Sequence, residues 1–306
     1  MKKLLAILLC AVMLLSACAL AEGRQITVKN VALTSNGTVA LDLSALEAVI
    51  DVAAEGEAAG ARLDITANGS SLGSVVAALV GQEALLQINA MTSSAYALDV
   101  SGLDLSSVTS SVENVMAEDN GAAFDAVLAQ LDGIVTDGGV TTLNGMDYQT
   151  TLISISEEQM AALIAAAAEQ NASVAEQMDG MSVSLSGAYY DAEGSDIVDA
   201  SMSFDYDGEQ MEVGVYAEYT KGEAGNDLLS LNLTVTADGE SFGLNFDVVI
   251  ANGDSAWLPT SIGDAVLLSV DEAAAEDGPV MTDLQNLAQS VLLGAMTAIS
   301  GQLTAE

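Results

Sequence analysis

The sequence contains no histidine, and its only two cysteines, Cys10 and Cys18, lie close to the N-terminus. Zinc sites in proteins are built largely on His and Cys ligands. Cysteine nucleophiles and Ser-His-Asp machinery need the same residues. The composition therefore excludes those metal sites and catalytic arrangements, and we expect no cofactor. If the N-terminal segment is removed on export, the remaining chain also has no disulfide.

Basic side chains are almost as scarce. The chain has 6 Lys and Arg residues against 44 Asp and Glu residues, and its formal net charge is −38. After Lys3 only Arg24, Lys29, Arg62 and Lys221 remain. Nucleic-acid binding requires basic side chains that displace counterions from phosphates, so we exclude a nucleic-acid partner. An excess of acids is typical of a solubilising surface, and weak cation collection or docking to a basic partner stay open.

The N-terminus has the layout of a secretory signal. Lys2 and Lys3 precede an apolar run from Leu4 to Leu15, and small residues follow up to Ala21. A membrane-spanning helix needs roughly 20 apolar residues, which is more than this run provides. The sequence therefore predicts a signal peptide over residues 1–21 and export to the cell envelope.

Two cleavage sites compete. Leu15-Ser16-Ala17-Cys18 resembles the bacterial lipobox, and this resemblance implies that Cys18 is diacylated and anchors the protein to the outer face of the membrane. Two acyl chains bury enough CH₂ groups for stable anchoring. The alternative is ordinary cleavage after Ala21, which would release a freely secreted protein.

Five segments of the second half share a pattern in which apolar and polar residues alternate: 181–189, 201–207, 211–219, 229–236 and 241–250. Alternation with period two places all apolar side chains of a strand on one face. Asn-Gly and Asp-Gly pairs, which favour tight hairpin turns, begin at Asn36, Asn68, Asn144, Asp207, Asp238 and Asn252. Short turns join antiparallel neighbours, so these segments predict a meander with one apolar and one acidic face.

Two helices are expected to cover the apolar face. The first begins at Ser156, where Gln159 three residues later completes a capping box. The second begins near Pro279, a residue that suits the first helical turn. The predicted fold class is thus α+β: an antiparallel meander sheet with one apolar face, flat or curved into a half-barrel, covered by two or more amphipathic helices.

The first half is expected to be rich in strands and to end in helices. Strand-like stretches cover residues 25–33, 45–54, 61–67, 74–80, 84–90 and 95–100, and helical ones cover 105–118 and 122–135. A Gly- and Asp-rich stretch, 132–139, then breaks the pattern. We therefore predict an N-terminal half over residues 24–139 and a C-terminal meander with its helices over residues 140–306.

Large side chains of the alternating apolar set are the candidate ligand contacts. They are Met202, Phe204, Tyr206, Met211, Tyr219, Phe242 and Phe246. Ligand pockets are mostly apolar and concave, and these residues could line one between sheet and helices. The alternative is that they fill an ordinary core.

Two groups of acids suggest weak calcium binding. One lies in the stretch 205–209, and the other contains Asp271, Glu272, Glu276 and Asp277. A calcium-binding EF-hand needs oxygen ligands over twelve residues between two helices, whereas the flanks of 205–209 alternate as strands do. The alternatives are a hairpin turn and a solvated loop.

The order of lipobox, meander and amphipathic helices resembles the LolA/LppX class of envelope lipid carriers. The similar region is mainly residues 144–306, and the segment 148–159 looks like the strand-to-helix element of that class. The resemblance implies an incomplete barrel that holds acyl chains between sheet and helices. The chain also looks like exported lipoproteins of anaerobic Firmicutes.

These observations favour a non-enzymatic envelope protein that binds an apolar or amphipathic ligand. The rival interpretation is a structural or interaction protein with a filled core, acting through its acidic sheet face. An enzyme would have to work with carboxylates alone, for example as a paired acid and base on a glycan, and no spacing singles out such a pair.

Overall fold

The computed structural model describes residues 23–55, 58–100, 134–170, 181–206, 209–222, 225–273, 275 and 277–303. The signal segment with Cys18 and Ala21 lies outside these residues. So do the helix expected over 105–118 and all but the end of the one expected over 122–135.

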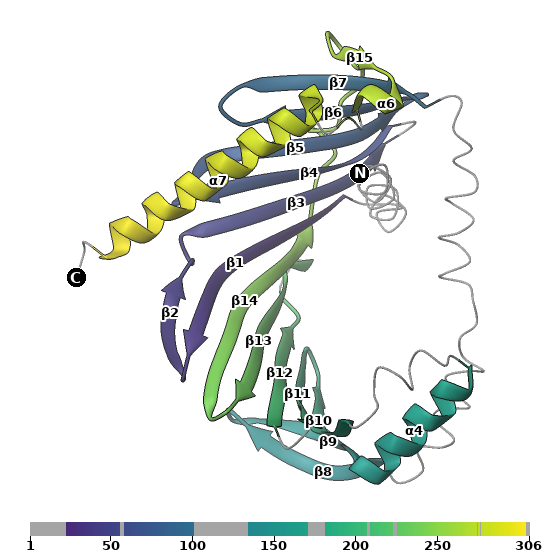
Figure 1. Ribbon diagram of the computed structural model, residues 1–306, viewed down its shortest axis with the longest axis vertical. Helices are drawn as coiled ribbons and strands as arrows, with labels where there is room; N and C mark the ends of the chain where they lie inside the picture. The colour runs from purple at the N-terminus through teal and green to yellow at the C-terminus, as the bar shows by residue number, and fades with distance from the viewer. Residues whose placement is uncertain are drawn as a thin grey trace. The chain divides into compact units, whose positions relative to one another are not determined.

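Strands make up most of the described chain and form one sheet of 15 strands, which is antiparallel except where β15 runs parallel to β7 (Figure 1). The strands are β1 (Arg24–Ser35), β2 (Thr38–Asp42), β3 (Leu46–Glu55), β4 (Ala58–Ala67), β5 (Ser70–Val80), β6 (Glu83–Asn89), β7 (Ser93–Asp99), β8 (Val135–Leu143), β9 (Met146–Ile155), β10 (Met181–Ala192), β11 (Ser195–Tyr206), β12 (Glu209–Thr220), β13 (Asp227–Ala237), β14 (Glu240–Asn252) and β15 (Val266–Leu268). The helices are α4 (Glu157–Gln170), α6 (Val270–Ala273) and α7 (Pro279–Leu303). The predicted fold class, α+β with an antiparallel meander, is confirmed.

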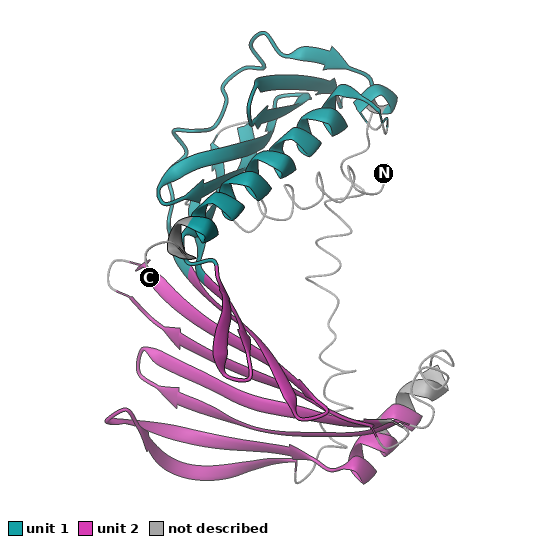
Figure 2. Ribbon diagram, turned by 60° about the vertical axis from the view of Figure 1, so that its left-hand side comes forward, with its two compact units in different colours: residues 1–30, 43–119, 249–306 teal, residues 31–42, 120–248 magenta. Residues whose placement is uncertain are grey.

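The strand order is β15-β7-β6-β5-β4-β3-β1-β14-β13-β12-β11-β10-β9-β8, and β2 pairs with β1. The chain divides into two compact units (Figure 2). The first unit contains residues 1–30, 43–119 and 249–306, and the second contains residues 31–42 and 120–248. The first unit is therefore built from both ends of the sequence, and the second from its middle.

The register of β10 to β13 confirms the predicted alternation. Val183 lies opposite Phe204, which lies opposite Met211, and Met211 lies opposite Ala237. Because each strand is antiparallel and in continuous register with the next, the odd-numbered apolar residues of β10, β12 and β13 share a face with the even-numbered ones of β11.

Four of the predicted hairpin turns are confirmed by their backbone angles. Asn36, Asn68, Asn144 and Asp238 have positive φ, as do the glycines that follow them. The prediction for Asn252-Gly253 is wrong, because β14 continues through Asn252. There the Gly253 N–H donates to the Gly23 carbonyl at 2.8 Å. A Cβ at Gly253 would lie 3.0 Å from the Arg24 carbonyl carbon, so the glycine allows two backbones to approach closely.

The core of the first unit lies between its sheet and the C-terminal helix. Leu86, Ile88, Tyr96 and Leu98 are buried on one face of β6 and β7 together with Leu287 of α7. In Figure 1, α7 lies across β4, β5 and β6. The helix was expected on the second-half meander, and the structure places it on first-half strands instead.

Close packing fixes the position of α7. A Cβ added at Gly73 would lie 2.6 Å from the Asn89 carbonyl oxygen and 2.2 Å from a methyl carbon of Leu287. The Ser290 hydroxyl donates to the Leu72 carbonyl at 2.7 Å. The packing of α7 on β5 therefore requires glycine at residue 73, where a larger side chain would clash, and a Leu72 carbonyl that accepts from Ser290.

A buried ion pair lies on the opposite face of the same unit. Asp51 is 3% exposed and accepts hydrogen bonds from Arg62 at 2.7 Å and from Gln25 at 2.9 Å. The Arg62 guanidinium also contacts Asp64 at 2.8 Å and lies 5.6 Å from the ring centre of Trp257. Pairing of this kind offsets the cost of removing a carboxylate from water.

The Gly- and Asp-rich stretch 132–139 was expected to interrupt regular secondary structure. It does so only in part, because β8 begins at Val135. The helix predicted to run to Val135 is therefore wrong at its end. The register between β8 and β9 shifts between Asp137 and Gly139. The Gly139 N–H donates to the Asp137 carboxylate at 2.7 Å, which satisfies a backbone donor at the bulge.

Candidate functional site

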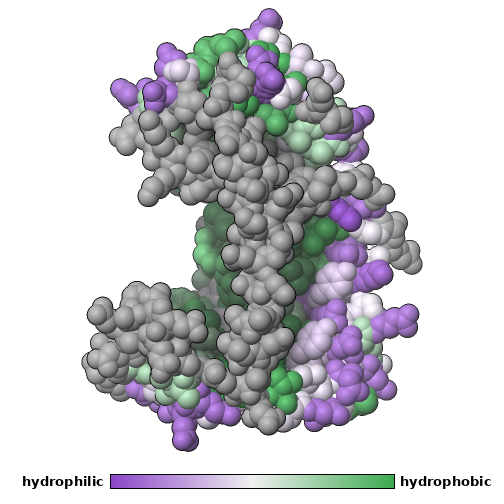
Figure 3. Space-filling model, turned by 90° about the vertical axis from the view of Figure 1, so that its right-hand side faces the viewer, coloured by the Kyte–Doolittle hydropathy of each residue, from purple (hydrophilic) through white to green (hydrophobic). Residues whose placement is uncertain are grey.

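The second unit presents an apolar face formed by alternate residues of β10 to β14. We define the apolar face as Val183, Leu185, Val198, Met202, Phe204, Met211, Val213, Val215, Leu229, Leu231, Leu233, Val235, Phe242, Leu244 and Phe246. The opposite polar face carries Ser182, Ser184, Ser203, Glu212 and Thr236. In Figure 3 hydrophobic and hydrophilic residues likewise occupy separate areas of the surface.

The apolar face is only partly shielded from water. Phe242 is 55% exposed, while Val198, Met211 and Val235 are each 39% exposed. Among the described members of this face, Val183 alone is fully buried, at 4%. Contiguous exposed apolar patches often mark interaction or ligand-binding surfaces on proteins.

The sequence-predicted ligand contacts fall together on this face. Met202, Phe204, Tyr219 and Phe246 are half-buried, and Met211 and Phe242 are exposed. The Tyr206 backbone pairs with Glu209 at the end of the β11–β12 hairpin, and its side chain lies outside the described part of the structure. The structure thus brings six of the seven onto one surface, and that they contact a ligand stays a prediction.

Sequence reasoning missed a small core on the polar face. Ile197 is 1% exposed and Tyr148 is 4% exposed. The Tyr148 hydroxyl is 3.0 Å from the Ser195 hydroxyl, and its ring meets the Tyr190 ring edge-to-face at 6.3 Å. The signal for this cluster was the consecutive pair Tyr189-Tyr190, which places one aromatic ring on each face of β10.

One end of the apolar face carries a tyrosine–aspartate rim, which we define as Tyr189, Asp191, Asp196, Tyr219 and Asp227. Asp196 lies directly opposite Asp191 on β10 and opposite Tyr219 on β12. Tyr189 donates to Asp196 at 2.9 Å, and Tyr219 donates to Asp227 at 2.8 Å. Like charges on directly opposed residues destabilise a sheet, so the Tyr189 hydroxyl offsets the repulsion between Asp191 and Asp196.

These hydrogen bonds raise the pKa values of the two tyrosines in the rim. The bond to Asp196 is the main cause of a raised pKa at Tyr189, and desolvation adds to it. The bond to Asp227 does the same for the pKa of Tyr219. Both phenols therefore stay protonated and keep donating to carboxylates well beyond neutral pH.

The first predicted helix begins as expected. The Ser156 N–H donates to the Gln159 side-chain oxygen at 2.9 Å, and the Gln159 N–H donates to the Ser156 hydroxyl at 3.3 Å. These reciprocal bonds confirm the capping box that starts α4. The helix packs against β10, and its first residue, Glu157, reaches a hollow beside Ser182 and Ser184.

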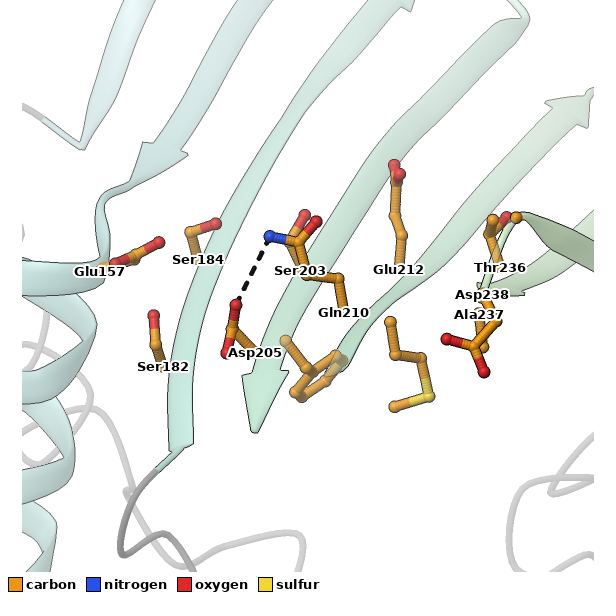
Figure 4. A pocket seen from close by; sticks show the side chains of 13 residues that line it. Glu157, Ser182, Ser184, Ser203, Asp205, Gln210, Glu212, Thr236, Ala237 and Asp238 are labelled. Atoms are coloured by element: carbon orange, nitrogen blue, oxygen red, sulfur yellow. Dashed lines mark hydrogen bonds between the residues drawn. The ribbon is translucent and has the colours of Figure 1, made fainter. Parts of the chain in front are cut away.

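This hollow in the second unit measures about 640 Å³. Figure 4 shows its polar lining, in which Gln210 donates to Asp205 at 3.4 Å. The labelled contributors are Glu157, Ser182, Ser184, Ser203, Asp205, Gln210, Glu212, Thr236, Ala237 and Asp238. Hydroxyls and carboxylates line it together with Phe204 and Met211, and Lys and Arg are absent from its described lining, so its polar part suits polar or cationic groups rather than anions.

Asp207 and Glu276, one from each acidic group, lie outside the described residues. Within the described ranges no cluster of three or more Asp, Glu, Cys or His side chains is placed to hold an ion. Glu272 accepts hydrogen bonds from the Ser269 N–H and hydroxyl and so caps α6, which lowers the pKa of its carboxyl. In the stretch 205–209, Tyr206 ends β11 and pairs with Glu209, which begins β12. Weak calcium binding stays an untested prediction.

No family model matches the chain, and no curated protein matches it. Among solved structures, the crystal structure of the Mycobacterium tuberculosis lipoprotein LppX is similar, with 14% sequence identity. The match covers 78% of this chain and 92% of LppX, with a TM-score of 0.14. Folds with such a TM-score do not superimpose, so the functional argument rests on the residues of this chain. None of the helices in the described ranges is both long and apolar enough to cross a bilayer.

Proposed function

We propose that this protein is a non-enzymatic, lipid-anchored envelope protein that binds an apolar or amphipathic ligand on the apolar face of its second unit. The observation that carries the proposal is the partial exposure of that face, with Phe242 at 55% and Met211 at 39%. Burying apolar area is favourable by roughly 25 cal/mol per Å², so a ligand that covers these side chains gains affinity from them.

The dimensions of the apolar face suit an alkyl chain. The apolar row on β11 runs from Val198 to Phe204, six steps of about 3.3 Å, or roughly 20 Å. One leaflet of a bilayer has a hydrocarbon thickness of about 15 Å. A membrane lipid chain can therefore lie along one strand without leaving the apolar surface.

Binding is tested with the exported protein and N-phenyl-1-naphthylamine, an uncharged probe that fluoresces in apolar surroundings. We expect saturable binding, and native mass spectrometry should detect an acyl species that co-purifies. A protein that neither enhances the fluorescence nor carries an extractable ligand would contradict the proposal.

The anchor is tested by Cys18→Ser. We expect the variant to leave the membrane fraction, because the thiol that carries the acyl chains is lost. Cys10→Ser, which changes a cysteine inside the signal's apolar run, is the matched control and should fractionate as the unchanged protein does. If the Cys18 variant still fractionates with the membrane, the protein is not held there by lipidation.

A second candidate is an interaction protein that works through its polar face. The hollow of about 640 Å³, with its carboxylate and hydroxyl lining, favours this role. Binding of a basic peptide that is abolished by Glu212→Gln and unaffected by changes at Phe242 would support the second candidate over the first.

A further inference from the structure

The charge pattern around the apolar face narrows the class of ligand. Asp191, Asp196 and Asp227 stand at one end of that face, and Glu209 stands at the other end of β12. Lys221 follows β12 and is the one base in residues 31–42 and 120–248. The rim thus carries three carboxylates, whereas the sequence of the whole unit supplies a single ammonium group.

The rim is held in place by hydrogen bonds rather than by basic partners. Asp227 accepts from Tyr219 at 2.8 Å and from the Gly222 N–H at 3.2 Å, while Asp196 accepts from Tyr189 at 2.9 Å. These neutral donors orient the carboxylates and leave their negative charge uncompensated. Each carboxylate has about four lone-pair sites, so both can accept further hydrogen bonds from a ligand.

An anionic head group would meet repulsion at this rim. Fatty acids and anionic phospholipids are normally held by Arg or Lys, whose charge matches carboxylate or phosphate. A ligand with an ammonium end would instead place its charge against Asp196 and Asp227 while its alkyl chain lies over Val198, Met202 and Phe204. Both carboxylates are half-buried, which reduces the screening of such a contact.

We propose that the apolar face selects amphiphiles with a cationic end, a long-chain ammonium compound, and that the tyrosine–aspartate rim holds the cation. This inference rests on the proposed function, because it assigns the polar end of the ligand whose alkyl chain lies on the apolar face.

The test compares three twelve-carbon probes below their micelle concentrations: dodecylammonium, dodecyl maltoside and dodecyl sulfate. Each displaces N-phenyl-1-naphthylamine from the exported protein. We expect the cationic probe to bind at least tenfold more tightly than the anionic one, with the uncharged probe between them. Equal or tighter binding of dodecyl sulfate overturns the inference but leaves the proposed function standing, whereas failure of the naphthylamine to bind removes both.

Variants distinguish the rim from the overall negative charge. An exposed ion pair contributes up to about fivefold in affinity, so Asp196→Asn with Asp227→Asn should lower affinity for the cationic probe roughly tenfold. Affinity for dodecyl maltoside should be unchanged, which also shows that the variant is folded. Asp199 lies on the polar face opposite Tyr216, so Asp199→Asn removes a charge there and should leave cation affinity unchanged. If one such distant change has the same effect as Asp196→Asn alone, general electrostatic attraction explains the preference and the rim does not.

Discussion

The Tyr96 hydroxyl on β7 donates a hydrogen bond of 2.6 Å to the Asp283 carboxylate on α7, although 187 residues separate them in the sequence. Tyr96 is 6% exposed and belongs to the core of the first unit. The bond therefore ties the C-terminal helix to a strand that is formed early in the chain.

This bond should make stability depend on pH at both extremes. Hydrogen bonds from Ser94 and Tyr96 lower the pKa of Asp283, so its contribution to the free energy of unfolding is lost as pH falls below the ordinary value of 3.8. Burial, followed by the bond to Asp283, raises the pKa of Tyr96, so its contribution is lost as pH rises above 10.0. Tyr96→Phe should cost about 1 kcal/mol at pH 7, and its difference from the unchanged protein should narrow outside this window.

Denaturant unfolding measured at several pH values checks this prediction. Trp257 is the only tryptophan and lies in the first unit, so its fluorescence reports on that unit. A stability difference that stays constant from pH 3 to pH 11 would show that Tyr96 and Asp283 are not coupled.

The buried carboxylate of Asp51 should make Arg62 sensitive to substitution. Arg62→Met leaves Asp51 with the Gln25 amide but without its ion pair, and we expect a loss of about 3–5 kcal/mol. Asp64→Asn removes only the half-exposed partner of Arg62 and should cost less than about 1 kcal/mol. Adding Asp51→Asn to Arg62→Met should restore part of the loss. Hydrogen exchange of β3 and β4 amides measures all three, and similar losses for Arg62→Met and Asp64→Asn would contradict the assignment.

Two leucines of α7 provide a matched pair. Leu287 is 7% exposed and packs on the core, whereas Leu293 is 60% exposed. Leu287→Ala should cost about 2–5 kcal/mol through lost burial and a cavity. Leu293→Ala should change stability by no more than about 0.5 kcal/mol. Thermal unfolding followed by Trp257 fluorescence measures both effects. Equal unfolding midpoints for the two variants would contradict the packing of α7 on this core through Leu287.

Residues of similar exposure on opposite faces test which face binds the probe. Val198 on the apolar face is 39% exposed, and Tyr216 on the polar face is 36% exposed. Val198→Asn should weaken N-phenyl-1-naphthylamine binding roughly tenfold, which corresponds to about 1.5 kcal/mol of lost apolar burial. Tyr216→Asn should leave the affinity unchanged, with circular dichroism confirming that both variants are folded. The reverse order of effects would assign binding to the polar face.

Local patterns predicted much of this fold. Period-two alternation located β10 to β14 and the side chains that share a face, because side-chain direction in a strand depends only on position. Asn-Gly pairs located turns at Asn36, Asn68 and Asn144, because Asn and Gly tolerate positive φ. The capping box located the start of α4 for a similar reason, since its bonds join residues only three apart.

Features that depend on distant residues were not predicted. The apolar stripe of α7 fits any apolar sheet face, and only the close approach at Gly73 and the bond from Ser290 to Leu72 identify the first-unit strands as its partner. The Asn252-Gly253 pair resembles a turn, yet its neighbour is Gly23 at the start of the chain. The tyrosine–aspartate rim was missed because the register that brings Asp191, Asp196 and Tyr219 side by side is not visible in any one strand.

The first unit is completed by α7, which is synthesised long after the strands β3 to β7 of the sheet on which it packs. Its strands β3 to β7 cannot bury Leu86 and Ile88 until Val280, Leu287 and their neighbours arrive. A growing chain thus exposes the apolar face of this sheet while more than 150 residues are still to be added. A chain truncated before Pro279 should therefore aggregate rather than fold as a shortened protein.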